Sequence, residues 1–226
     1  MKLVITCEHG GNTIPKEYKS LFTDTSVLET HRGYDLGALD VFNYLQPLAD
    51  YSNYSKTSRL LIELNRSLLH KNVYSEFTKK LPINEKKQII KKHYSVYRSA
   101  VTDYIQARIK NNNDVLHLSI HSFTPQLNQD IRNCDIGLLF DSRKANEKEI
   151  AVALKKSILA KNPNYRIRFN YPYLGKTDGF TTTLRKQFPK HYSGIEIEIN
   201  QSFSVDNKMP DAIKTVLKES ILKFKA

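Results

Sequence analysis

The sequence predicts a three-layer α/β domain in which helices cover both faces of a mainly parallel or mixed central sheet. Short apolar runs alternate along the chain with longer segments of helical periodicity, which is typical of strands joined by helical crossovers. Several runs are apolar almost throughout, as expected for strands that are covered on both faces. The chain has 226 residues, which suits a single domain (1–226) with a sizeable core.

The predicted strands are the apolar runs that end at polar or turn residues. They are Lys2–Cys7, Arg59–Leu64, Val115–Ile120, Ile136–Asp141, Arg166–Asn170 and Gly194–Ile199.

The predicted helices are segments in which apolar residues recur at three- and four-residue steps. They are Leu36–Ala49, a stripe formed by Ile89, Val96, Ala100, Val101, Tyr104, Ile105 and Ile109, then Glu149–Leu159, and a last helix that begins near Pro210-Asp211. Proline suits the first turn of that last helix. The stretch Tyr171–Phe188 contains Pro172, Gly175 and Gly179, and we expect a long irregular loop there that acts as a substrate loop or lid.

Composition limits the class of protein. Apolar content of 40% and charged content of 26% are those of an ordinary globular protein, and no run approaches the roughly 20 apolar residues of a membrane helix. The N-terminus Met1–Thr6 is too short an apolar segment for a signal peptide, so the expected location is the cytoplasm. The net charge of +12 raises nucleic-acid binding as an alternative. The lysines are spread over predicted helices, which favours a solvated surface that attracts small anions.

The two cysteines, Cys7 and Cys134, provide neither a disulfide framework nor a Cys-x-x-Cys metal pattern. Cys7 precedes Glu8-His9, so a cysteine hydrolase is a further alternative. A small apolar residue at a buried strand end is the favoured interpretation.

Two histidines stand at predicted strand ends. His9 follows the first strand and His121 closes a later one, and the carboxyl ends of neighbouring parallel strands meet at one edge of a sheet. Zinc in hydrolases has three protein ligands and an open position. The candidates for the third ligand are Asp35, His31, Glu8 and the pair Glu196/Glu198. His31 and Asp35 have the i, i+4 spacing of one helical face. His117 is expected below the site, in the core.

Candidate residues for substrate binding and for proton transfer lie at two other apolar runs. Arg59 and Asn65-Arg66 bracket an apolar segment, and a guanidinium group grips a carboxylate through two hydrogen bonds; strand-end salt bridges are the alternative. Glu196 and Glu198 are two apart on a predicted strand and therefore face one side. Buried carboxylates need a metal, an arginine or a shared proton, and one of them suits a general base. The alternative is a solvated edge strand.

These stretches together resemble the N-formylglutamate amidohydrolase family. The matching segments are Thr6–Pro15, His31–Ala38, Ser58–Leu60, Asn65–Ser67, Ser119–Ser122, Gly175–Gly179 and Gly194–Asn200. The resemblance implies a metal-dependent amidohydrolase with a carboxypeptidase-like fold, which releases formate and glutamate from N-formylglutamate. A related zinc hydrolase acting on another N-acyl amino acid or a peptide-like amide is the nearest alternative, and a nucleic-acid-binding module without catalysis is the non-enzymatic one.

The resemblance also implies roles for individual residues. In the wider carboxypeptidase and aspartoacylase group, the first-strand histidine and a later strand-end histidine bind zinc, and these match His9 and His121. An Asn-Arg pair holds the substrate carboxylate, which matches Asn65-Arg66. Arg59 is then a second cationic contact. Lys176 and Thr177, in the loop expected to close over the substrate, are further candidate contacts.

Two positions depart from that group. Asn12 stands where the group has a glutamate three residues after its first histidine. We therefore expect Asp35 as the third ligand, with Glu8 and His31 as alternatives. For the base, the family favours the position of Glu198 and the aspartoacylases that of Glu196; we favour Glu198. Histidine and carboxylate ligands suit Zn²⁺, and also manganese, iron or cobalt.

Overall fold

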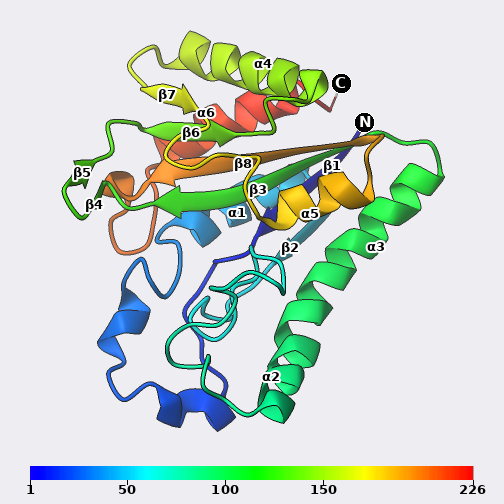
Figure 1. Cartoon of the computed structure of the whole chain (residues 1–226). Coiled ribbons are helices and arrows are strands. Elements are labelled where there is room, and N and C mark those ends of the chain that lie inside the picture. The colour runs from blue at the N-terminus through cyan, green and yellow to red at the C-terminus, as the bar shows by residue number, and fades with distance from the viewer. Residues whose placement is uncertain (226) are drawn as a thin grey trace.

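The computed structural model describes residues 1–225 and has the predicted three layers (Figure 1). Its six-stranded sheet has the order β2-β1-β3-β8-β6-β7. The strands are β1 (Lys2–Cys7), β2 (Tyr51–Tyr54), β3 (Val115–Phe123), β6 (Ile136–Leu139), β7 (Ile167–Phe169) and β8 (Tyr192–Asn200). The first four in sheet order are mutually parallel, whereas β6 runs antiparallel to β8 and parallel to β7. The predicted fold class, with a mixed and mainly parallel sheet, is confirmed.

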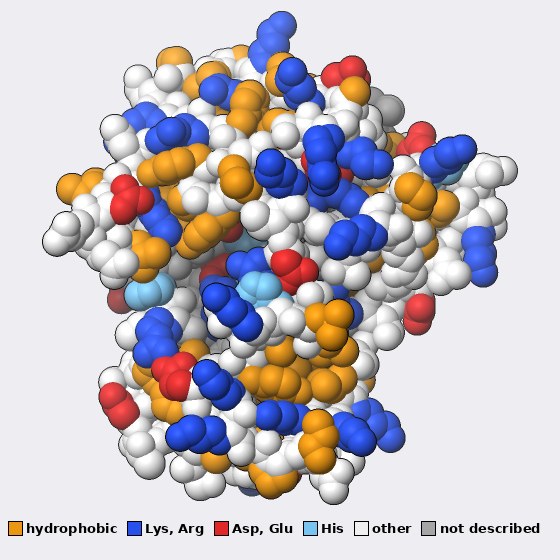
Figure 2. Space-filling model, viewed as in Figure 1, with side chains coloured by type: hydrophobic (Ala, Val, Ile, Leu, Met, Phe, Trp, Pro, Cys, Tyr) orange, Lys and Arg blue, Asp and Glu red, His pale blue; other side chains and the backbone are white. Residues whose placement is uncertain are grey.

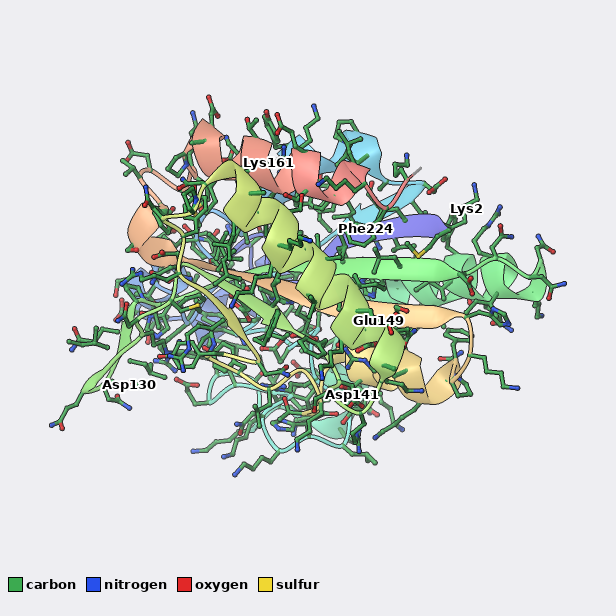
Figure 3. All side chains as sticks on the ribbon, turned by 90° about the horizontal axis from the view of Figure 1, so that it is seen from above. Lys2, Asp130, Asp141, Glu149, Lys161 and Phe224 are labelled. Atoms are coloured by element: carbon green, nitrogen blue, oxygen red, sulfur yellow. The ribbon has the colours of Figure 1, made fainter. Side chains whose placement is uncertain are left out.

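Helices cover both faces of the sheet. One face packs against α1 (Ala38–Leu45), α4 (Ala145–Lys161) and α6 (Asp211–Leu222); α4 and α6 lie side by side when seen from above (Figure 3). The other face packs against α3 (Val96–Lys110) and α5 (Phe180–Gln187), and α2 (Ile83–Ile89) leads into α3 through a π-helix, Ile90–Ser95. No helix within residues 1–225 is both long enough and apolar enough to cross a membrane.

The smaller elements are 3₁₀ helices and one hairpin. The 3₁₀ helices are Lys16–Leu21, Ser26–Glu29, Gln46–Leu48 and Gln201–Phe203. The hairpin pairs β4 (Gln126–Leu127) with β5 (Asp130–Ile131). It lies where β3 ends and projects from the body of the molecule, with Asp130 directly after its turn (Figures 1 and 3).

The two faces of the central strands differ in chemistry because side chains alternate along a strand. In β3 and β8, one face is mainly apolar and packs against α1, α4 and α6; its apolar residues are Leu116, Leu118, Ile120, Ile195, Ile197 and Ile199. The opposite face is a buried polar row formed by His117, Ser119, His121, Glu196 and Glu198. His117 is bonded to the Thr6 hydroxyl at 2.7 Å and the Tyr192 hydroxyl at 2.8 Å, as expected for a histidine of the core.

One predicted strand is wrong. Arg59–Leu64 forms turns rather than a strand, although Leu61, Ile62 and Leu64 are almost completely buried. An apolar run signals burial, and a buried loop gives the same signal as a buried strand. Three strands were not predicted. They are β4 and β5 of the short hairpin, and β2, an edge strand of the main sheet whose residues Tyr-Ser-Asn-Tyr include no aliphatic side chain.

The stretch Tyr171–Phe188 is irregular only in its first half, because α5 begins at Phe180. Three consecutive threonines, Thr181–Thr183, have low helix propensity, so the sequence did not indicate a helix. Contacts supply the missing stability: the Thr181 hydroxyl donates to Glu196 at 2.6 Å, and Arg185 is ion-paired with Glu147.

The apolar stripe predicted from Ile89 to Ile109 is partly wrong. Val96 is 63% exposed and Ala100 is also exposed, whereas Tyr97 and Val101 are buried. The π-helix Ile90–Ser95 adds a residue to the turn, and this shifts the buried face by one position. The remaining predicted strands and helices each coincide with, or overlap, an observed element.

Candidate metal and substrate site

A pocket opens at the carboxyl ends of β1, β3 and β8. His9 follows β1, His121 is near the end of β3, and Glu196 and Glu198 lie on β8. The cavity measures about 130 Å³. Figure 2 shows a hollow on this face in which acidic, basic and histidine side chains meet.

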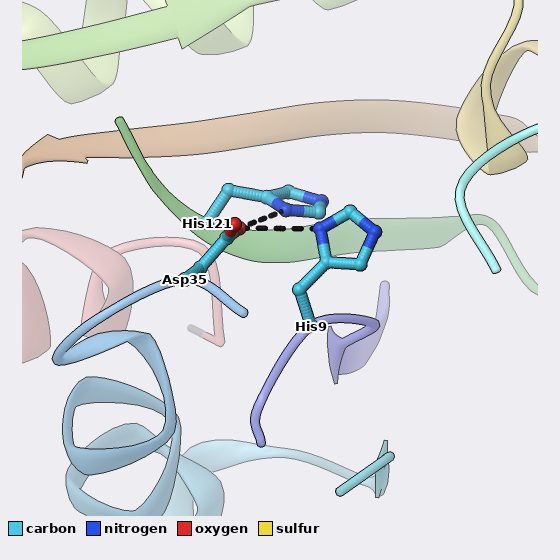
Figure 4. Close-up of side chains that lie close together, drawn as sticks. All are labelled: His9, Asp35 and His121. Atoms are coloured by element: carbon cyan, nitrogen blue, oxygen red, sulfur yellow. Dashed lines mark hydrogen bonds and ion pairs between the residues drawn. The ribbon is translucent and has the colours of Figure 1, made fainter. Parts of the chain in front are cut away.

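His9, Asp35 and His121 converge in the floor of this pocket (Figure 4). Nδ1 of His9 lies 3.3 Å from Oδ2 of Asp35, and Nδ1 of His121 lies 2.9 Å from the same oxygen. All three side chains are buried, and within the described chain they form the one cluster whose candidate ligand atoms all lie within 4.8 Å of one another. Two imidazoles and a carboxylate are a suitable ligand set for a divalent transition metal.

The second nitrogen of each imidazole faces a carboxylate. Nε2 of His9 is bonded to Oε1 of Glu63, and Nε2 of His121 lies 3.1 Å from Oε2 of Glu8. Proteins orient metal-ligating histidines in this way, through a carboxylate on the far side of the ring. Glu63 was missed by the sequence analysis because it lies inside an apolar run that resembled a strand.

The alternatives for the third ligand are found elsewhere. Glu8 lies behind His121, where the Tyr97 hydroxyl donates to it at 2.8 Å. Burial raises the pKa of Glu8, but the hydrogen bond and the charge of His121 outweigh it and the pKa is lowered. His31 is exposed, in a turn rather than a helix. The helical face expected from the spacing of His31 and Asp35 does not exist.

Arg59 joins two of the site carboxylates. Its Nη1 donates to Oδ1 of Asp35 at 3.2 Å, and its Nε donates to Oε2 of Glu63 at 2.8 Å. The guanidinium group also lines the pocket. The guanidinium group of Arg59 therefore binds the carboxylates around His9. It also brings a positive charge to the cavity wall.

Glu198 lies opposite His121 in the pairing of β8 with β3. Burial raises the pKa of its carboxyl group to about 7. Its Oε2 is buried and has no hydrogen-bond partner among residues 1–225. Glu196, by contrast, accepts the hydrogen bond from Thr181. Because β8 lies between β3 and β6, the alternative of a solvated edge strand is wrong.

Asn65 and Arg66 are held at the pocket by their surroundings. Oδ1 of Asn65 accepts a hydrogen bond from the Phe180 amide at 2.7 Å, at the start of α5. The backbone carbonyl of Arg66 accepts from the Tyr94 hydroxyl at 2.7 Å and from Arg98 at 3.2 Å. The side chain of Arg66 lines the pocket and donates to the backbone carbonyl of Asp178.

The loop before α5 forms one wall of the pocket. Tyr173, Leu174, Thr177 and Asp178 line the cavity. Lys176 is exposed and is not among the lining residues. Of the two loop residues predicted to contact substrate, the structure therefore brings Thr177 to the pocket and leaves Lys176 outside it.

Comparison with known proteins identifies the relationship. The family model for N-formylglutamate amidohydrolase matches residues 1–204. The chain belongs to the N-formylglutamate amidohydrolase family. A search of curated proteins found no match.

Two solved structures support the fold of this family member. The structure of gene product Atu2144 from Agrobacterium tumefaciens superposes with a TM-score of 0.81 at 25% identity, covering 100% of this chain and 92% of that one. N-formylglutamate amidohydrolase from Ralstonia eutropha JMP134 has a TM-score of 0.72 at 16% identity, covering 98% and 90%. A metallo-carboxypeptidase from Burkholderia cenocepacia is a distant structural neighbour, with a TM-score of 0.39 at 10% identity, covering 98% and 56%.

The negative charges around the site suit a bound cation. The carboxylates gathered around the two imidazoles are Glu8, Asp35, Glu63, Glu196 and Glu198. Burial lowers the pKa of His121, yet hydrogen bonds and charge from Asp35 and Glu8 outweigh it and raise that pKa well above its ordinary value. The site therefore stabilises positive charge at the imidazoles, and the unpartnered Oε2 of Glu198 is a free acceptor beside them.

Cys7 lies on the other side of the sheet from this site. Its side chain belongs to the apolar core formed with α1, α4 and α6. Burial, and then the charges of Glu8 and Asp35, raise the pKa of the thiol well above its ordinary value. A thiol that stays protonated in an apolar core is a poor nucleophile, so the geometry disfavours the cysteine-hydrolase alternative.

Proposed function

We propose that this member of the family is a metal-dependent amidohydrolase that cleaves N-formyl-L-glutamate to formate and L-glutamate. The observation that supports this most is the convergence on one pocket of His9, Asp35 and His121 with the carboxyl group of Glu198 and the Asn65-Arg66 pair. The family model supports the reaction class. Amide hydrolysis requires activation of water, proton transfer and orientation of the substrate. The two histidines with Asp35, Glu198 and the Asn65-Arg66 pair suit these three tasks in turn.

His9, Asp35 and His121 are the residues that would hold the metal, which we propose to be zinc. When bound, a divalent ion supplies a Lewis acid that activates water and polarises the formyl carbonyl. The outer hydrogen bonds from Glu63 to His9 and from Glu8 to His121 would keep both rings oriented with Nδ1 toward Asp35.

Glu198 is the proposed general base. Its Oε2 takes a proton from the attacking water as the new C–O bond forms. The same oxygen returns the proton to the amide nitrogen as the C–N bond breaks, so that formate and a free amine are released. A carboxyl group with a pKa of about 7 exchanges protons readily in both directions near neutral pH. Glu196, already occupied by Thr181, is the second candidate.

Asn65 and Arg66 are proposed to bind a carboxylate of the substrate. Arg66 offers a guanidinium group at the pocket wall, and the amide of Asn65 lies beside it at the start of α5. Arg59, fixed between Asp35 and Glu63, places a positive charge where the carbonyl oxygen gains negative charge. Thr177 on the loop is positioned for a further contact.

The test is a substrate panel on zinc-loaded protein, in which release of formate or acetate and of the free amino acid is measured directly. N-formyl-L-glutamate is compared with N-formyl-L-aspartate, N-acetyl-L-glutamate and N-formyl-L-methionine, with Glu198→Gln as the inactive control. Fastest turnover of N-formyl-L-glutamate supports the proposal. Faster turnover of another N-acyl amino acid would change the proposed substrate but not the proposed reaction class. No turnover of any of the four compounds would contradict the proposal.

A further inference from the structure

Arg132 is a buried arginine next to the proposed active site. It follows directly on β5, at the base of the β4–β5 hairpin, and is only 6% exposed. The hairpin lies at the edge of the sheet where β3 ends, which is the edge that holds the pocket (Figure 1). No motif in the sequence marks this residue, and it has no part in the proposed mechanism.

The surroundings of Arg132 differ from those of the other two buried arginines. Arg185 is ion-paired with Glu147 at 2.8 Å and also donates to two backbone carbonyls. Arg98 donates to two backbone carbonyls and stacks between Tyr94 and Phe180. Both guanidinium groups are thus well satisfied, as buried charges are expected to be.

Arg132 makes two hydrogen bonds, as Arg98 does, but unlike Arg98 it leaves a buried nitrogen without a partner among residues 1–225. Its Nη1 donates to the Thr124 carbonyl at 3.4 Å and to the Tyr173 hydroxyl at 3.0 Å. Its Nε is buried without a hydrogen-bond partner, and in the described part of the chain no carboxylate is ion-paired with it. A buried cation with an unsatisfied donor and no counter-charge is costly. Such a cost is offset when an anion binds.

Tyr173 connects Arg132 to the pocket. The guanidinium group lies 5.0 Å from the centre of the Tyr173 ring, and Tyr173 lines the cavity that also holds His9, His121 and Glu198. Tyr173 is 43% exposed, whereas Arg132 is buried and is not among the residues that line the cavity. Arg132 therefore lies directly behind the wall that a bound substrate would touch.

We propose that Arg132 and the Tyr173 hydroxyl form a second anion subsite, which binds the side-chain carboxylate of an N-acyl acidic amino acid. This inference rests on the proposed function, because a dicarboxylate substrate brings two negative charges to the pocket. Asn65 and Arg66 provide for one of them. Arg59 is engaged by Asp35 and Glu63, so Arg132 is the buried arginine with capacity left for the second.

The decisive comparison is between N-formyl-L-glutamate and N-formyl-L-glutamine, which differ in the side-chain charge alone. In the zinc-loaded wild type we expect a lower KM for the acid. In Arg132→Gln the ratio of the two KM values should fall about 10- to 100-fold, because a charge-assisted hydrogen bond is removed. The kcat values should change little. Arg132→Lys, which keeps the charge, should retain part of the preference. Arg143→Gln, at an exposed surface arginine, should behave as wild type.

Binding of the free amino acids separates this inference from the proposed function. Calorimetry compares L-glutamate with L-glutamine on zinc-loaded wild type and Arg132→Gln. A preference for glutamate that disappears in the variant supports the subsite even where no N-formyl substrate is hydrolysed. An equal preference in both proteins overturns it, even where hydrolysis is fast. If Arg132→Gln does not fold, Tyr173→Phe is compared in its place, and an unchanged preference in that variant is the contradicting result.

Discussion

Glu198 lies directly across from His121 where β8 pairs with β3. The pairing places an unpartnered carboxyl oxygen next to an imidazole whose Nδ1 is 2.9 Å from Asp35. The proposed base and one of the proposed metal ligands, His121, are thus held on adjacent central strands. Precise placement of this kind is what proton transfer in a hydrolase requires.

The first prediction is that Glu198→Gln lowers kcat by about 10²- to 10⁴-fold, the usual contribution of a general base. The amide has nearly the same shape and keeps the fold, and bound metal should remain stoichiometric. Steady-state kinetics with metal analysis of the same sample measures both. Glu196→Gln is the matched variant and should show a smaller loss. Wild-type kcat in Glu198→Gln would exclude this residue as the base.

The second prediction concerns pH and the metal-free protein. The pKa of Glu198 is raised by burial from 4.5 to about 7, so the folded state binds this proton more tightly than the unfolded chain does. The carboxyl group therefore contributes stability that is fully present below pH 4.5 and is lost as the pH rises through 7. Relative to Glu198→Gln, the wild type should lose on the order of 3 kcal/mol between those limits.

Urea unfolding of chelator-treated wild type and Glu198→Gln at pH 5 and pH 8 measures this difference. The wild type should become the less stable of the pair as the pH rises. A stability difference that does not change with pH would show that Glu198 titrates normally.

The third prediction is that Glu63→Gln weakens metal binding by about 10- to 100-fold, the effect of losing a carboxylate behind a ligating histidine. Glu63 accepts from His9 and from Arg59, so its charge orients both. Competition with a chromophoric chelator gives the dissociation constant. Glu76→Gln, in a surface ion pair with Arg32, is the control. An affinity equal to that of the control would mean that Glu63 has no part in the metal site.

The fourth prediction separates Arg66 from Lys176. Arg66→Ala should raise KM for the anionic substrate about 10- to 100-fold through loss of charge-assisted hydrogen bonds. Folding should be affected much less, because Tyr94 and Arg98 bind the backbone carbonyl of Arg66, which the substitution leaves in place. Lys176→Ala should leave KM nearly unchanged, since Lys176 lies outside the pocket. The opposite ranking of the two variants in initial-rate kinetics would reverse these assignments.

The sequence predicted the fold best where strands are buried on both faces. β1, β3 and β8 are rich in aliphatic residues; β1 was predicted in full, and β3 and β8 were each predicted over six of their nine residues. β2 was missed because an edge strand needs few apolar residues. The segment Arg59–Leu64 was misassigned because it is a loop that the surrounding helices bury. Periodicity reports burial, and only tertiary context distinguishes a buried loop from a buried strand.

The same limit applies to the site. His9 and His121 were predictable because each stands at or near the end of an apolar strand, and the topology brings such ends together. Asp35 remained one candidate among several, because its position depends on a long loop whose path the sequence does not indicate. Glu63 and Arg132 gave no signal at all. Their roles arise from contacts with His9 and Tyr173, residues far from them in the chain.

The central claim is that His9, Asp35 and His121 bind a metal ion, and its most direct test is metal content. Elemental analysis of untagged wild type should give close to one equivalent of metal, or one equivalent after loading with zinc. His121→Ala should lose it, whereas His70→Ala, at a histidine outside the pocket, should keep it. Well-folded wild type that cannot be loaded, or His121→Ala that binds as much metal as the wild type, would contradict the account.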